Sequence, residues 1–239
     1  MGTSSGRQAP VGKLWRPAKT AAVRYASGQG AAPEAVRELV AHYCTAQVSL
    51  LQTDGATKSV LPALVPTAVA LGTFYKIWEA EGCQTALVQA GVPRDSEQTW
   101  ETLIPALLAA LAGDGATLTE AIARAALLEH LEGVWLLGNA LSSPPELLAE
   151  PPPAAGEGVR HFLGLALYRG LLADLGEILE FHAADVSQGV ARQTDLKAYI
   201  LSALLDWPTT IPASDTWSAA QAAALLQEML TYLAGCHGR

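Results

Sequence analysis

Apolar residues recur along most of this chain at intervals of three and four positions, which is the repeat of an amphipathic α-helix. Strict alternation of apolar and polar residues, which is typical of half-buried strands, is scarce. A capping box, T-L-T-E at 117–120, marks the clearest helix start. The expected helices cover residues 36–52, 67–82, 96–113, 120–141, 160–185, 195–207 and 216–235. The pattern predicts an all-α fold, an irregular bundle of about seven or eight helices with no significant sheet.

Proline and glycine then suggest how the chain is divided. Residues 142–158, SSPPELLAEPPPAAGEG, form the expected connector between the two halves of the bundle. We expect residues 34–141 and 159–239 to be these halves and to belong to one domain. Residues 1–33 are rich in Gly, Ser, Ala and Pro and are expected to form a partly extended arm.

The charge of the arm is opposite to that of the remainder. The chain has a net charge of −8, but residues 1–33 carry five basic side chains and no acid, so the remainder carries −13. Three interpretations stay open: the arm lies on the acidic body of its own or a neighbouring subunit, it contacts nucleic acid, or it is a transit peptide. We favour the first, because the acidic body would repel phosphates. The candidate partner-binding residues are Arg7, Lys13, Trp15, Arg16, Lys19, Arg24 and Tyr25, with the two aromatic residues as apolar anchors.

The segment 160–185 places histidines and acids among leucines, which raises the question of a metal or acid/base site. A helical projection puts His161 and His182 on the apolar stripe, whereas Asp174, Glu177 and Glu180 point away from it. The two histidines are also about 31 Å apart along a helix, so they cannot bind one ion. We therefore expect a core helix with a charged back.

A third histidine and the sequence motifs also give no sign of a metal or acid/base site. His130 also lies on an apolar face, and His161 and His182 are each expected to hydrogen-bond a loop carbonyl group. The candidate pocket residues are His130, Trp135, His161 and His182. The sequence contains no catalytic, phosphate-binding or metal-binding motif that we recognise, so we expect neither a cofactor nor a metal, and catalytic residues stay unidentified. Three scattered cysteines and the lack of an adequate apolar span lead us to expect a cytoplasmic, soluble protein.

Two classes of function are compatible with these features. The first is a helical protein-interaction subunit, an adaptor, chaperone-like or regulatory protein that binds another protein chain or forms a homo-oligomer. The six tryptophans support it, since tryptophan is enriched at binding hot spots. The alternative is a small-molecule or cofactor-binding protein, or an enzyme, with an apolar pocket between helices. We favour the first class, and we do not expect nucleic acid as a partner.

Overall fold

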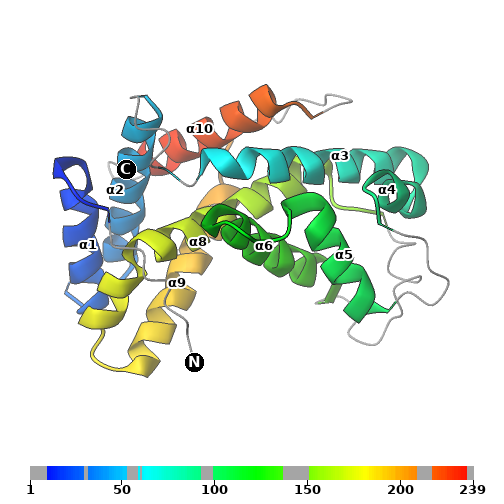
Figure 1. Cartoon of the computed structure of the whole chain (residues 1–239). Helices are drawn as coiled ribbons and strands as arrows, with labels where there is room; N and C mark the ends of the chain where they lie inside the picture. Colours follow the sequence, from blue (N-terminus) through cyan, green and yellow to red (C-terminus); the bar gives the residue numbers. More distant parts are fainter. Residues whose placement is uncertain are drawn as a thin grey trace. The chain divides into compact units, whose positions relative to one another are not determined.

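The computed structural model describes residues 10–29, 32–52, 59, 61–92, 99–136, 151–208 and 217–235, apart from the side chains of residues 32, 135 and 136. These residues form nine α-helices and no strand, which confirms the all-α fold (Figure 1). The α-helices are α1 (Arg16–Ala26), α2 (Ala32–Leu51), α3 (Val65–Glu81), α4 (Cys83–Gln89), α5 (Trp100–Ala112), α6 (Leu118–Leu131), α8 (Ala155–His182), α9 (Val186–Leu205) and α10 (Ala219–Gly235). Shorter turns are the 3₁₀ turns η1 (Lys13–Trp15) and η3 (Pro62–Leu64) and the π-helical turn η4 (Glu132–Leu136).

The chain divides into two compact units. Unit 1 comprises Met1–Val60, Leu167–Pro208 and Leu226–Arg239, and unit 2 comprises Leu61–Ala166 and Thr209–Leu225. Each unit therefore combines segments that are distant in the sequence. No helix in the described ranges is long and apolar enough to cross a membrane.

Unit 1 is built around α1, α2, the second half of α8, and α9. Helix α1 packs along α2, and both contact α9. Its apolar interior combines aromatic and aliphatic side chains: Trp15, Tyr25, Leu39, Tyr43, Leu171, Leu175, Leu196 and Ile200. The ring of Trp15 lies 5.7 Å from that of Tyr43, measured between centroids.

Unit 2 is built around α3, α4, α5, α6 and the first half of α8. Helix α3 is apolar nearly all round because it is buried on several sides, and Phe74 lies edge-on to Trp78 with 5.7 Å between ring centroids. Gly72 allows the indole ring of Trp217 to lie close to α3, since a Cβ atom at position 72 would lie 2.5 Å from Cγ of Trp217. The core of this unit is otherwise largely aliphatic, with Leu71, Leu103, Leu107, Leu127, Leu131 and Leu163 fully or almost fully buried.

Local hydrogen bonds explain where several helices begin and end. The capping box is confirmed: Thr117 Oγ1 accepts from the backbone N–H of Glu120, and a Glu120 carboxylate oxygen accepts from that of Thr117. Helix α6 ends at Leu131 and passes into η4, so the expected helix over 120–141 is not a regular α-helix beyond Leu131, and its last five residues lie outside the described residues. Helix α9 begins nine residues earlier than expected, because the carboxylate of Asp185 caps it by accepting from the N–H of Gln188 at 2.8 Å.

Candidate functional site

Three side chains of unit 2 form a continuous hydrogen-bonded cluster, which we call the Tyr–His–His row. Tyr75 comes from α3, His130 from α6 and His161 from α8. The hydroxyl of Tyr75 lies 2.7 Å from Nε2 of His130, and Nδ1 of His130 lies 2.8 Å from Nδ1 of His161. If the hydroxyl donates to His130 and the Nδ1–H of His130 donates to His161, both contacts are satisfied with neutral rings. His161 therefore bonds His130 rather than the carbonyl group that we expected.

Burial keeps the row neutral. It lowers the pKa of His130 to about 3, and the neighbouring His161 lowers it further. Burial also lowers the pKa of His161, although the charge of Glu129 opposes this shift. The hydroxyl of Tyr75 has a raised pKa for the same reason, since a buried phenolate would lose its hydration. At neutral pH the row is therefore uncharged.

The local backbone explains how three bulky rings fit together. A Cβ atom at Gly158 would lie 2.5 Å from Cε2 of Tyr75, so glycine is what allows this ring to lie against α8. A Cβ atom at Gly133, in η4, would approach Cε1 of His161 only to 3.9 Å. The π-helical turn follows His130 almost directly, and π-helical turns occur frequently at functional sites.

The other two candidate pocket residues do not join this row. Trp135 lies in η4, and its side chain is outside the described residues. His182 lies at the last residue of α8, in unit 1, where its half-buried ring is edge-on to Phe181 with 5.0 Å between centroids. Within the described part of the chain, no three His, Cys, Asp or Glu side chains gather as metal ligands. The expectation of no metal and no cofactor stays a prediction.

One acid expected on the charged back of α8 is buried instead. Asp174 is 3% exposed, and its carboxylate accepts hydrogen bonds from Tyr43 at 3.0 Å and from Gln47 at 3.3 Å. Ser59 continues the network by donating to the side-chain carbonyl of Gln47 at 2.6 Å. The expectation that Asp174 faces solvent was wrong because α2 covers this side of α8 in unit 1. Glu177 and Glu180 are exposed as expected.

The candidate partner-binding residues fall into two groups. Trp15 and Tyr25 are buried in unit 1, and the hydroxyl of Tyr25 donates to the carbonyl oxygen of Arg192 at 2.6 Å. Arg24 binds both carboxylate oxygens of Glu38 at 2.9 Å. Lys13 and Arg16 are exposed and Lys19 is half-buried, whereas Arg7 lies outside the described residues. The described part of the segment 1–33 is therefore mainly helical and is anchored by its aromatic residues.

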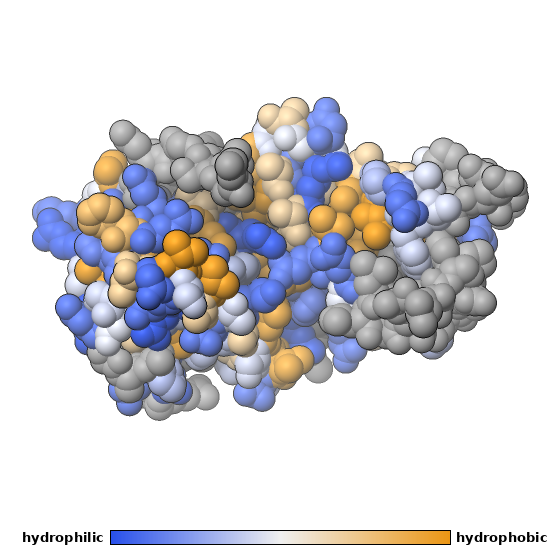
Figure 2. All heavy atoms as spheres, turned by 90° about the horizontal axis from the view of Figure 1, so that it is seen from below, coloured by the Kyte–Doolittle hydropathy of each residue, from blue (hydrophilic) through white to orange (hydrophobic). Residues whose placement is uncertain are grey.

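The junction of α8 and α9 exposes large apolar side chains that we did not single out from the sequence. Phe181, Val186 and Val190, which we call the α8–α9 tip, are 82%, 84% and 59% exposed. The helical projection of residues 160–185 already places Phe181 about 130° from the centre of the apolar stripe, so a signal for it was present. Tyr75 gave no such signal, because the helix that carries it is apolar nearly all round. Figure 2 shows the face seen from below Figure 1, where apolar and hydrophilic residues gather in small neighbouring groups.

A comparison with known families matches residues 55–232 to a family model, that of QatB, described as the Qat anti-phage system associated protein QatB. The matched range covers about three quarters of the chain and includes the Tyr–His–His row and the α8–α9 tip, but not α1. No curated protein and no solved structure matches the chain. On the strength of this match, the chain belongs to the QatB family of anti-phage system associated proteins.

Proposed function

We propose that this chain is a protein-interaction subunit of its anti-phage system and that it binds another protein chain or a second copy of itself through the α8–α9 tip. A protein of this family is a component of a multi-protein system, so a binding role fits its setting. We place this role in the cytoplasm, where Cys44 and Cys83 would stay reduced, as the buried thiols of the structure.

The exposure of the tip is the observation that carries the proposal. Phe181, Val186 and Val190 each leave more than half of their surface in water, although the unit has a well-packed core in which many leucines are fully buried. Burying one such side chain stabilises an interface by about 1.5 to 3 kcal/mol. Three apolar side chains exposed together at a helix junction form a patch whose surface a binding partner would remove from water.

The experiment is a binding measurement between this chain and each purified protein component of the system, a second copy of this chain included. We expect one of them to bind, and Val186→Ser to weaken that binding by about tenfold, as loss of roughly 1.4 kcal/mol requires. Leu205→Ser is the matched control, since Leu205 is 75% exposed on the same helix but lies near its other end.

Equal effects of the two serine variants would contradict the proposed role of the tip. Circular dichroism of both variants checks that they fold, and neither exposed substitution removes a core contact. Binding of neither another component nor a second copy would contradict the protein-interaction role itself.

A further inference from the structure

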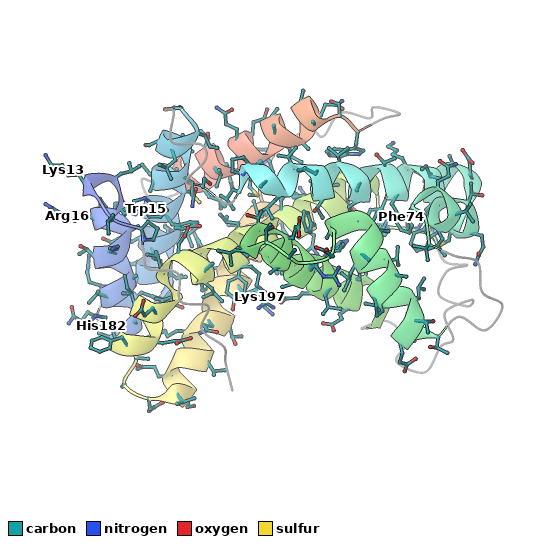
Figure 3. The ribbon with its side chains drawn as sticks, viewed as in Figure 1. Lys13, Trp15, Arg16, Phe74, His182 and Lys197 are labelled. Atoms are coloured by element: carbon teal, nitrogen blue, oxygen red, sulfur yellow. The ribbon has the colours of Figure 1, made fainter. Side chains whose placement is uncertain are left out.

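Unit 1 carries a second exposed surface whose chemistry complements the tip. The residues around η1, which we call the α1 basic end, are Val11, Lys13, Leu14, Arg16 and Lys19. Val11 is 84% exposed and Leu14 is 37% exposed. Figure 3 shows the side chains of Lys13 and Arg16 pointing away from the ribbon, whereas Trp15 points inward.

Burial of Trp15 fixes the direction of this surface. Its ring is 5% exposed and packs on Tyr43, so η1 cannot rotate without removing an aromatic side chain from the core. Lys13 and Arg16 are consequently held on the outside. Within the described ranges, no carboxylate lies within ion-pair distance of Lys13, Arg16 or Lys19. The basic end therefore offers unpaired positive charge beside exposed apolar surface.

The tip has the opposite charge around its apolar centre. The exposed carboxylates of Glu177, Glu180 and Asp185 lie at the helix ends that carry Phe181 and Val186. Glu177 precedes Phe181 by one helical turn, and Asp185 directly precedes Val186. The basic side chain of this segment, Arg192, lies over the ring of Tyr25 at 5.1 Å from its centroid and is half-buried. The rim of the tip is therefore acidic.

The two surfaces are separated by the length of α1. The hydroxyl of Tyr25, in the last turn of α1, bonds Arg192 of α9, two residues after Val190. Arg16 is the first residue of the same helix, whose 11 residues span about 16 Å, and Lys13 lies just before it in η1. The basic end of one copy is therefore too far away to cover the tip of that same copy.

We propose that the α1 basic end of one copy docks on the α8–α9 tip of a second copy. This inference rests on the proposed function, because it names the chain that covers the tip. Val11 and Leu14 contact the apolar centre, while Lys13, Arg16 and Lys19 face the acidic rim. The contact joins two different surfaces, so it is heterologous and produces a ring or an open chain of copies. Its charge component weakens as salt rises, because exposed charges are screened over about 8 Å at physiological ionic strength.

The test is sedimentation velocity of the full chain over a concentration series, at low and at physiological salt. We expect the wild type to self-associate more strongly at low salt. A tip variant (Glu177→Lys with Glu180→Lys) and an end variant (Lys13→Glu with Arg16→Glu) should each raise the apparent Kd by about tenfold or more. An equimolar mixture of the two variants should associate again, because each reversed surface then meets its complement. Glu157→Lys, an exposed reversal in unit 2, is the control and should leave association unchanged.

A wild type that stays monomeric at low salt, or a mixture that stays monomeric, overturns self-docking. The charges reversed are all exposed, and circular dichroism identifies any variant that fails to fold. The proposed function is tested separately by the binding of Val186→Ser to other system components. If that variant loses such binding while the wild type is monomeric, the tip serves another protein and self-docking is wrong.

Discussion

The Tyr–His–His row makes the stability of the protein depend on pH in the mildly acidic range. In the folded state burial lowers the pKa of His130 to about 3, whereas an unfolded histidine titrates near 6.5. Below pH 6.5 the unfolded chain therefore binds a proton that the folded chain does not bind, and acid favours unfolding. The stability that His130 contributes is fully present above pH 6.5 and is lost progressively as pH falls toward its folded pKa.

The size of this loss follows from the gap between the two pKa values. Each pH unit inside that gap costs about 1.36 kcal/mol of unfolding free energy, so a change from pH 6.5 to about pH 5 costs roughly 2 kcal/mol. His161 adds to the loss in the same direction, because its pKa is also lowered by burial. Most carboxylates titrate near pH 4, so they contribute little above pH 5.

The assay is urea unfolding of wild type and His130→Gln, followed by tryptophan fluorescence, at several pH values from about 5 to 7.5. Glutamine keeps a hydrogen-bonding side chain but does not titrate, so the slope of unfolding free energy against pH should fall by about 1.36 kcal/mol per unit below pH 6.5. Tyr75→Phe, which keeps the histidine and removes its hydroxyl partner, should be less stable at every pH but retain the slope. Identical slopes for wild type and His130→Gln would refute this reasoning.

Three further predictions concern burial. Trp15→Ala should destabilise unit 1 by about 3 to 5 kcal/mol in urea unfolding, because Trp15 is 5% exposed and packs on Tyr43. Lys13→Ala should have almost no effect, because Lys13 is exposed. Equal effects of the two substitutions would mean that η1 does not anchor the unit. Gly72→Ala should lower the stability of the protein by about 1 to 3 kcal/mol in thermal unfolding, since the added Cβ atom would lie 2.5 Å from Cγ of Trp217. Gly133→Ala is the control, because a Cβ atom there meets no atom closer than 3.9 Å, and equal melting temperatures of the two variants would contradict the close contact at Gly72. In a Cys236→Ser variant, Cys44 and Cys83 should react with a thiol reagent at pH 8 only after the protein unfolds. Both thiols are buried, and burial raises the pKa of Cys83 to about 12. Fast labelling of the native protein would contradict this prediction.

The fold class was predictable because it depends on local patterns. A three-to-four repeat and a capping box are written in consecutive residues, and Thr117 with Glu120 forms the bonds that the motif implies. The start of α9 was missed because Val186–Thr194 has a weak apolar repeat, so its helical state depends on the Asp185 cap and on tertiary contacts. Local patterns therefore predicted that helices form, but not always where they begin.

The candidate site depended on contacts that the sequence does not show. The projection correctly put His130 and His161 on buried faces, but 31 positions separate them, and nothing local indicates that their rings meet. Tyr75 joins them from a third helix at a separation of 55 positions. Asp174 was misplaced for a related reason, since a single-helix projection does not include the neighbour that covers its polar side.

The close approach at Gly158 links the choice of residue at two positions. A methyl group at 158 would collide with the ring of Tyr75, yet the same methyl group would fit if position 75 held a small side chain. We therefore expect the two substitutions to be strongly non-additive: Gly158→Ala should be harmful beside tyrosine and nearly neutral beside Tyr75→Ala. The residue tolerated at position 158 therefore depends on the residue at position 75: a side chain larger than glycine at 158 is accepted only beside a smaller side chain at 75. A library that varies either position alone would miss the viable pair.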